Sequence, residues 1–275
     1  MRAQYERATE AFPVSDAVQV KAVAARTVRG EWLTPDGAAD AVMLYLHGGG
    51  YVIGSPRSHR HLAAAISLAA GVRTFTLDYR LAPEHPHPAA LDDAIAAYRW
   101  LRTRNHVPAQ RIVIAGDSAG GGLALALLVA LRDAGEALPA SAVLLSPWVD
   151  LSCNLPSCQP GAVPDPVIDP QVIRAMARAY MGRRNLRQPR ASPLFADLRG
   201  LPQLLVQAGG AESLLDDALQ IAMAASRAGV HTTLEVWPRM IHVWQWYAPI
   251  LDDGRVAIKR IAEFTRDALT RSEAV

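Results

Sequence analysis

The chain has 275 residues, of which 51% are hydrophobic and 20% are charged, with 28 Lys and Arg against 26 Asp and Glu. This composition is typical of a folded globular protein and excludes a disordered, collagen-like or disulfide-scaffold protein. The basic residues are scattered and no apolar stretch reaches the roughly 20 residues of a membrane span, so neither nucleic acid nor a membrane is expected as a partner.

The N-terminal residues 1–12 carry charges where a secretory signal peptide needs an apolar segment. A cytoplasmic location is therefore expected. Residues Val20 to Trp32 alternate partly between apolar and polar side chains, which predicts antiparallel strands at the edge of a sheet.

Short apolar runs then alternate with longer helical patterns. The predicted strands are Val42–Leu46, Thr74–Leu77, Ile112–Ala115, Ala142–Leu145, Leu204–Gln207 and Thr232–Val236. The predicted helices are Ala89–Arg102, Ala119–Arg132, Leu214–Arg227 and Val256–Leu269. Because most of the strands are apolar throughout, we expect helices on both of their faces. The order predicts an α/β fold with a mostly parallel, doubly wound sheet.

Residues 147–202 break this rhythm with a dense set of prolines and one good helix pattern. Asp169 is the expected N-cap and Pro170 the first helical residue. The apolar side chains expected on one face of this helix are Val172, Met176 and Ala179. A Pro-rich segment of this length is too long for a plain connection, so it predicts an insertion over one end of the sheet; a disordered loop is the alternative.

Two cysteines, Cys153 and Cys158, fall inside this segment. They are too few for a disulfide framework and lack the partner pairs of a zinc site. We therefore expect two reduced thiols and no metal.

A candidate nucleophile follows the predicted strand Ile112–Ala115, in the run Gly116-Asp117-Ser118-Ala119-Gly120. A serine with glycines two residues before and after it, between a strand and a helix, can occupy a tight turn that projects its hydroxyl into a cleft. Ser118 is therefore the expected nucleophile, and a helix N-cap is the alternative role for this serine.

A second motif, His47-Gly48-Gly49-Gly50-Tyr51, follows the predicted strand Val42–Leu46. Backbone N–H groups of such a loop can converge on an anion, and beside the serine they would form an oxyanion hole with the amide of Ala119. A phosphate or dinucleotide loop is disfavoured because its Lys-Ser/Thr ending or G-x-G-x-x-G spacing is absent. For His47 we expect hydrogen bonding inside the loop and no proton transfer.

Together with Asp78-Tyr79-Arg80-Leu81-Ala82-Pro83-Glu84, these two motifs resemble the hormone-sensitive-lipase-like branch of the α/β-hydrolase family, from about residue 40 to the C-terminus. The resemblance implies an α/β-hydrolase fold with a small helical cap. It implies a carboxylesterase with a Ser-acid-His triad in that chain order. It also implies that Asp78–Glu84 is a structural turn near the site.

The base of the triad is expected to be His242. Of the eight histidines, it alone follows the last apolar strand, where this fold places its base. The family usually carries a glycine close before this histidine, whereas Arg239 stands here, which leaves the shape of the loop open.

The acid is expected just beyond the strand Leu204–Gln207. The family pattern of Asp, any residue, Leu, any residue, Asp places Glu212 on the catalytic acid and Asp216 on a second acid. A glutamate can replace the commoner aspartate if the loop retreats by about one methylene. Asp216 is the alternative triad acid; its structural role, like that of Asp217, would be to cap the following helix.

Trp148, Val52 and Trp244 are expected to line the substrate pocket, as are Ile53 and Trp246, although aromatic residues are as often part of a core. We expect a single domain, residues 1–275, with a cap formed from roughly 1–20 and 147–202.

The predicted reaction is hydrolysis of short-chain acyl esters, small molecules, through an acyl-enzyme and without a cofactor. Lactone hydrolysis, N-acetyl amide hydrolysis and acyl transfer would use the same residues, and a non-catalytic ligand receptor is a more distant alternative. The strand Thr232–Val236 could lie at a sheet edge and pair with a second copy in a homodimer.

Overall fold

The computed structural model describes residues 2–9, 12–25 and 27–273 of the chain. Its centre is an eight-stranded sheet in the order β1-β2-β4-β3-β5-β6-β7-β8. β1 (Val18–Ala24) and β2 (Arg29–Pro35) form an antiparallel edge, as predicted, and β2 pairs antiparallel with β4. All other neighbouring strands pair in parallel. The register of these pairs shifts once, between Ala39 and Val42 of β3.

The parallel strands agree with the predicted ones to within three residues at each end. They are β3 (Ala39–Leu46), β4 (Val72–Leu77), β5 (Ile112–Asp117), β6 (Ser141–Leu145), β7 (Gln203–Gly209) and β8 (Thr232–Trp237). β8 lies at the edge of the sheet opposite β1, as predicted. The mostly parallel α/β architecture is thereby confirmed.

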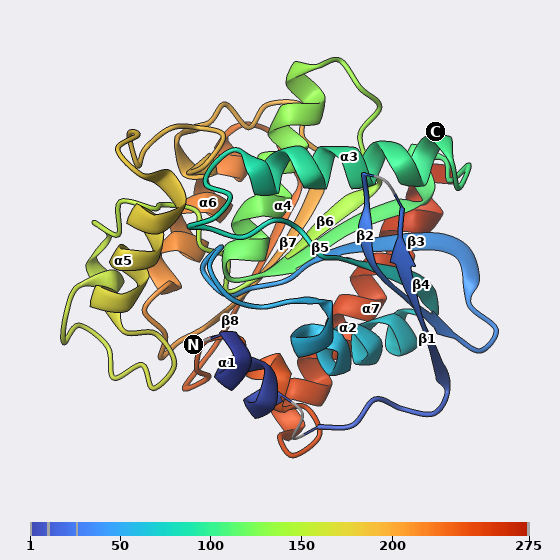
Figure 1. Cartoon of the computed structure of the whole chain (residues 1–275), viewed down its shortest axis with the longest axis horizontal. Coiled ribbons are helices and arrows are strands. Elements are labelled where there is room, and N and C mark those ends of the chain that lie inside the picture. The colour runs from blue at the N-terminus through green and yellow to red at the C-terminus, as the bar shows by residue number, and fades with distance from the viewer. Residues whose placement is uncertain (1, 10–11, 26, 274–275) are drawn as a thin grey trace.

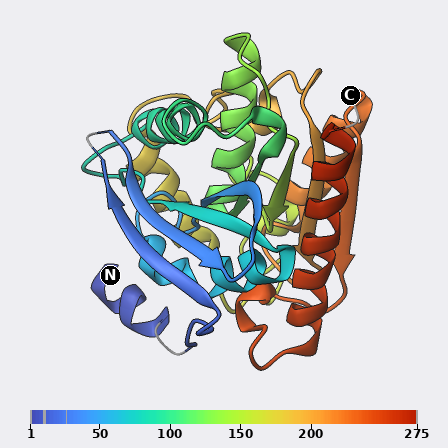
Figure 2. The same ribbon diagram turned by 90° about the vertical axis from the view of Figure 1, so that its right-hand side faces the viewer.

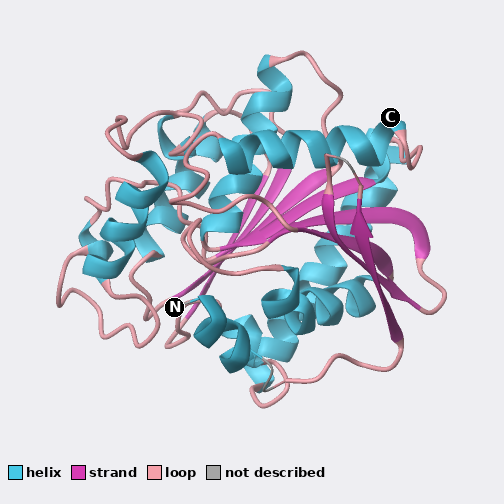
Figure 3. Cartoon of the chain, in the orientation of Figure 1, coloured by secondary structure: helices cyan, strands magenta, loops and turns pink. Residues whose placement is uncertain are grey.

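Helices cover both faces of the sheet (Figures 1 and 3). The helices are α1 (Arg2–Thr9), α2 (Pro56–Ala70), α3 (Ala89–Thr103), α4 (Ala119–Asp133), α5 (Pro170–Met181), α6 (Leu215–Arg227) and α7 (Asp252–Glu273). Short 3-10 turns are η1 (Ala109–Arg111), η2 (Pro156–Cys158), η3 (Pro193–Phe195) and η4 (Trp244–Tyr247). The two-fold alternation of the strands explains the layers: Leu44 and Ile114 pack with α3, α4 and α6, whereas Met43 and Val113 pack with α2 and α7.

Helix α2 was not predicted, although its start is written in the sequence. Ser55 is its N-cap and accepts a hydrogen bond from the amide of Ser58, while the Ser58 hydroxyl accepts one from the amide of Ser55. Pro56 occupies the first helical position. In Figure 2, α2 and the long C-terminal α7 lie on the same side of the sheet.

Helix α5 begins as predicted, because the Asp169 carboxylate accepts a hydrogen bond from the amide of Gln171. The face of α5 predicted to be apolar is not the face that packs against the core. Ile173, Ala177 and Tyr180 are the side chains that pack inward, whereas Val172 is 45% exposed. Val172 and Met176 instead line a cavity that α5 borders.

Close backbone approach brings β3 and the start of α4 together. A Cβ atom on Gly120 would collide with the carbonyl oxygen of Leu46, and one on Gly116 would collide with the carbonyl oxygen of Gly120. Both glycines are therefore required for the loops after β3 and β5 to lie side by side. Among the described residues, no helix combines the length and the apolar character that crossing a bilayer requires.

Candidate active site

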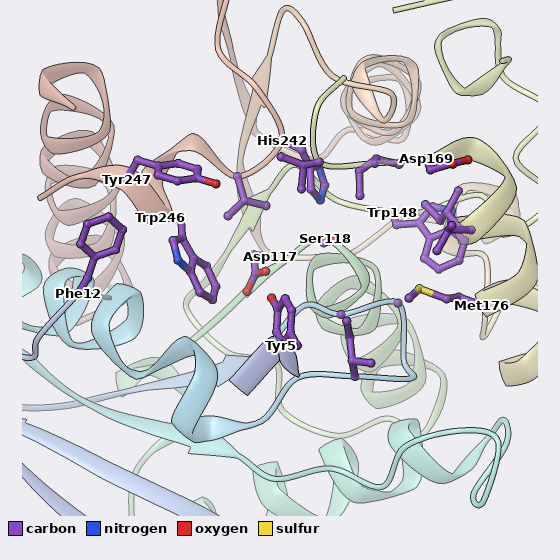
Figure 4. Close-up of a pocket in the computed structure, with 18 residues that line it drawn as sticks. Tyr5, Phe12, Asp117, Ser118, Trp148, Asp169, Met176, His242, Trp246 and Tyr247 are labelled. Atoms are coloured by element: carbon purple, nitrogen blue, oxygen red, sulfur yellow. The ribbon is translucent and has the colours of Figure 1, made fainter. Parts of the chain in front are cut away.

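A cavity of about 410 Å³ lies at the carboxyl ends of the parallel strands, where ligands of such sheets bind. Its wall includes Ser118 after β5, Gly49 and Gly50 after β3, Trp148 after β6 and His242 after β8. Figure 4 shows Ser118 and His242 at the middle of this cavity. The structure thus brings together residues separated by nearly two hundred positions in the chain.

Ser118 is held in a strained turn between β5 and α4. Its φ of 53° lies in the left-handed region, which is rare for residues other than glycine and is common at functional sites. The backbone fixes the turn: its amide donates to the carbonyl of Leu145 at 2.8 Å, and its carbonyl accepts from Trp148 at 2.9 Å. Ser118 stands at the N-cap position of α4, but its hydroxyl makes no capping bond and borders the cavity.

The glycine loop after β3 differs from the expectation at Gly48. Its amide already donates to Oδ1 of Asp117 at 3.1 Å and to Nε2 of His59 at 3.2 Å, so it points away from a substrate oxygen. The amides of Gly49, Gly50 and Ala119 have no hydrogen-bond acceptor among the described residues. These three are the donors left for an oxyanion.

Asp117 joins the glycine loop to the serine turn. Its Oδ1 accepts from the Tyr45 hydroxyl at 2.7 Å and from the Gly48 amide, while its Oδ2 lies 3.4 Å from Nε2 of His59. Burial alone would raise the pKa of Asp117, but the nearby His59 and the hydrogen bond from the Tyr45 hydroxyl hold it below its usual value. Asp117 is therefore an ionised anchor between the two loops.

His47 has the structural role that was predicted for it. Its Nδ1 donates to the carbonyl of Gly48 at 2.8 Å, and its ring stacks on Tyr79 with a centroid separation of 4.1 Å. Burial is the main cause that lowers the pKa of His47, to about 3, so the imidazole is neutral near pH 7. Tyr79 belongs to the segment Asp78–Glu84, and its hydroxyl donates to the carbonyl of His47 at 2.7 Å.

His242 and Glu212 lie close to each other beneath the cavity. Nδ1 of His242 is 3.7 Å from Oε2 of Glu212, and both side chains are buried. This separation is longer than a hydrogen bond. Within the described residues, neither Nδ1 of His242 nor Oε1 of Glu212 has another hydrogen-bond partner.

Ser146 ties the acid to the loop that carries the base, a link that the sequence analysis did not find. Its hydroxyl donates to Oε2 of Glu212 at 2.7 Å and accepts from the amide of Val243 at 3.1 Å. In the same loop, Arg239 has a φ of 64° and Val243 one of 50°. A residue in the left-handed region thus stands where the family usually has glycine.

Asp216 and Asp217 do not have the capping role expected of them. The N-cap of α6 is Leu214, without a side-chain bond. Asp216 instead accepts from the amide of Ser157 at 2.7 Å, and Asp217 accepts from the amides after β6, at 2.8 and 2.9 Å. Burial raises the pKa of Asp217 well above its usual value. Both acids fasten the segment after β6 to α6.

The cavity walls differ from the expected pocket residues. Trp148 and Ile53 line the cavity, whereas Trp244 is fully buried against Trp237, at a centroid distance of 5.7 Å, and Val52 lies outside the lining. Rings that the sequence analysis did not propose complete the wall; they are Tyr5, Phe12 and Tyr247, beside Trp246. Composition gave no signal for Tyr5 and Phe12, which come from the far N-terminal end.

The N-terminal helix is fastened to the domain beside the glycine loop. Arg2 donates from Nε to the carbonyl of Val52 at 2.7 Å and pairs with Glu84 at 2.6 Å. The hydroxyl of Ser55 donates to Glu6 at 2.8 Å. These contacts place Tyr5 over the cavity.

Cys153 and Cys158 are buried and carry no disulfide. Over the part of the chain that the structure describes, no group of three or more His, Cys, Asp or Glu side chains could hold a metal ion.

Comparison with known proteins identifies the family of the chain. A family model described as the alpha/beta hydrolase fold matches residues 43–246. The chain is 47% identical to an acetyl-hydrolase of Streptomyces hygroscopicus over 272 residues, 97% of this chain and 89% of that protein. It is 36% identical over 254 residues to the carboxylesterase/phospholipase LipF of Mycobacterium tuberculosis, 90% of this chain and 68% of that protein.

Among solved structures, the chain is similar to an esterase from the bacterial hormone-sensitive lipase family. The two share 50% sequence identity with a TM-score of 0.94, over 98% of this chain and 90% of the other.

Proposed function

The chain belongs to the α/β-hydrolase family, in its hormone-sensitive-lipase-like branch, and is a carboxylic ester hydrolase; from this premise we propose that it cleaves short-chain esters through an acyl-enzyme formed on Ser118. The observation that carries the proposal is that Ser118 and His242 line the same cavity and that the Glu212 carboxylate is buried 3.7 Å from the His242 imidazole. Each comes from the end of a different strand of the sheet.

In the first half of the reaction, His242 removes the proton of Ser118 as Oγ attacks the ester carbonyl carbon. The oxygen becomes an oxyanion and accepts hydrogen bonds from the amides of Gly49, Gly50 and Ala119. Glu212 orients the imidazole and stabilises its protonated form. The C–O bond to the alcohol then breaks, and the alcohol leaves with the proton from His242.

In the second half, His242 removes a proton from water as the water attacks the acyl-enzyme. The tetrahedral intermediate collapses, the acid departs, and Ser118 recovers its proton. No step requires a group other than these side chains, the loop amides and water.

The N-terminal arm and the segment 147–202 form the cap in this proposal. Tyr5 and Phe12 from the arm, and Ile168, Val172 and Met176 from the segment, border the cavity. A cavity of about 410 Å³ that must hold both halves of an ester leaves room for only a modest acyl group. This supports a preference for short acyl chains.

Substitution of Ser118 by Ala tests the proposal. Ser118→Ala should lower kcat for p-nitrophenyl acetate by three or more orders of magnitude, because no nucleophile replaces the hydroxyl. Circular dichroism and the melting temperature should stay those of the folded protein. Activity near the wild-type level in the folded variant would exclude Ser118 as the nucleophile.

A second candidate is removal of acetyl groups, from esters or from amides, since a 47% identical relative is named an acetyl-hydrolase. A panel of acetyl esters, lactones and N-acetyl amides with the same purified enzyme separates these reactions. We propose esters as the preferred class, so kcat/KM should be highest for them. Acyl transfer would show as product formed with an added alcohol in place of water.

We also propose a homodimer through the sheet edge. β8 is the edge strand, and Val236 on it is 40% exposed. Sedimentation equilibrium of the wild type and of Val236→Lys tests this: the lysine should shift the protein towards the monomer.

A further inference from the structure

The cavity has two chemically different sides, which Figure 4 shows to the left and right of Ser118 and His242. Phe12, Trp246 and Tyr247 lie on the left, and Tyr5 lies below Ser118 with its ring near that of Trp246; we call these four residues the aromatic side. Trp148, Met176 and Asp169 lie on the opposite side, together with the apolar residues of α5. An ester bound at Ser118 extends one half towards each side.

The aromatic side is assembled from two distant segments that contact each other ring to ring. The Tyr5 and Trp246 rings have a centroid separation of 6.4 Å at 54°, and Phe12 meets Tyr247 edge-on at 6.4 Å. These distances lie within the range in which aromatic rings attract each other. The rings therefore support each other at the edge of the cavity.

The indole of Trp246 is fixed from behind. His59 and His61 of α2 meet it edge-on, with centroid separations of 4.7 and 4.5 Å. Nε2 of His61 donates to the carbonyl of Trp246 at 3.1 Å. Burial is the main cause that lowers the pKa of His61, to about 4, so this imidazole is neutral near pH 7. A planar group that enters this side meets a rigid aromatic surface whose support is already ordered.

We infer that the aromatic side binds an aryl group on the alcohol half of the ester, so that esters of arylalkyl alcohols are preferred substrates. The inference rests on the proposed function in one respect: if the acyl group is short, the larger group of the ester, here a ring, belongs to the alcohol. The position of the rings agrees, because Trp246 and Tyr247 lie in η4, directly after the loop that carries His242, and His242 is the group proposed to deliver the proton to the departing alkoxide.

Ring stacking and edge contacts contribute about 0.5–1.5 kcal/mol beyond apolar burial, which corresponds to roughly 2- to 12-fold in kcat/KM. A saturated ring of similar volume buries comparable area and lacks the π-face. Comparison of these two ring types therefore isolates the aromatic contribution.

The experiment measures kcat/KM for benzyl acetate and cyclohexylmethyl acetate, two esters whose alcohols leave with similar ease. Wild type should prefer the benzyl ester by about fivefold. In Trp246→Leu the preference should fall below twofold, and Phe12→Leu, a smaller change on the same side, should lower it as well. Met176→Leu on the opposite side is the matched control and should keep the fivefold ratio.

A ratio near one in wild type, or a ratio that survives both Trp246→Leu and Phe12→Leu, would overturn the inference. Acetylcholine and its uncharged analogue 3,3-dimethylbutyl acetate are assayed in parallel, because aromatic rings near the Asp117 carboxylate could instead attract a cation. If kcat/KM for acetylcholine is higher than kcat/KM for both its uncharged analogue and benzyl acetate, the aryl assignment is wrong. Ser118→Ala separates the two claims, since hydrolysis that depends on Ser118 without any ring preference defeats only this inference.

Discussion

The groups proposed for the chemistry and the walls of the cavity are held in different ways. Ser118, Glu212 and the glycine loop sit at the ends of buried strands and are held by buried hydrogen bonds, such as the 2.8 Å bond from the Ser118 amide to Leu145 and the 2.7 Å bond from the Ser146 hydroxyl to Glu212. Much of the wall comes from segments outside the sheet, the N-terminal arm, α5 and η4, and part of it is held by contacts between aromatic rings, such as Phe12 with Tyr247. The groups proposed for the reaction are therefore positioned by the sheet, and the groups proposed to select the ester come from peripheral segments.

The largest expected effect that sharpens this comparison concerns the two acids. Glu212→Gln should lower kcat by roughly 10²–10⁴, because His242 loses the anion that stabilises its protonated form. Asp216→Asn should leave kcat within about threefold and lower the melting temperature, because its partner is the amide of Ser157 in the wall segment. Steady-state kinetics and thermal melts of both variants measure this. A greater loss of kcat in folded Asp216→Asn would reverse the assignment.

The next effect concerns Asp117, which the structure places between the glycine loop and the serine turn. Asp117→Ala leaves the Gly48 amide and the Tyr45 hydroxyl without this acceptor, so the oxyanion donors of the loop should lose alignment. We expect kcat to fall about 10- to 100-fold with little change in KM. Asp117→Asn keeps an oxygen acceptor and should recover most of the loss. Equal losses in the two variants would show that the carboxylate has another role.

The fold, and the placement of Ser118 and His242 at one cavity, could be predicted because their signals are local. Apolar strand runs, the glycines around Ser118 and the position of His242 after the last strand are each read within a few residues. The choice between Trp244 and Trp246 could not be made, because Val243 adopts a left-handed conformation and η4 then turns one indole inward and the other to the cavity. The sequence does not distinguish the amide of Gly48 from those of Gly49 and Gly50 as an oxyanion donor, because its acceptor, Asp117, lies 69 residues away.

The aromatic rings of the N-terminal arm could not be assigned to the cavity from the sequence either. Nothing near Tyr5 or Phe12 in the sequence indicates that they reach a cavity that also contains Ser118, more than one hundred residues later. Their position depends on tertiary contacts of the arm, such as Arg2 with Glu84. Glu212 is intermediate: its register came from the family pattern, and the structure adds Ser146 as its hydrogen-bond donor.

Acyl chain length probes the walls alone. Each methylene that fits adds about 0.8 kcal/mol, or roughly fourfold in kcat/KM, until the cavity is full. Values for p-nitrophenyl esters should therefore peak between acetyl and hexanoyl and then drop. Met176→Ala removes a side chain that contacts Gly50 across the cavity, so it should shift the peak to longer chains. A steady rise to palmitoyl esters in wild type would contradict the small cavity.

The smallest expected effect is on the stability of the fold in acid and concerns His61, the α2 residue that contacts the wall residue Trp246. Its pKa is lowered in the fold, so the folded chain binds fewer protons than the unfolded chain between about pH 4 and pH 6.5. Stability from this group is complete above pH 6.5 and is lost as the pH falls, by up to about 1.4 kcal/mol for each pH unit. Urea unfolding should show that the free energy of unfolding of wild type, relative to that of His61→Gln, falls by about 2 kcal/mol from pH 7 to pH 5. A difference that stays constant would contradict a neutral, buried His61.

The central claim, that one serine at the end of β5 performs the chemistry, is tested most directly by covalent labelling with a serine-directed organophosphonate. The account predicts one adduct per chain, on the peptide that contains Ser118, and loss of esterase activity in proportion to the adduct formed. Mass spectrometry after proteolysis locates the label, and Ser118→Ala should remain unlabelled. A label on another residue that accompanies the loss of activity, or full activity in chains labelled at Ser118, would contradict the claim.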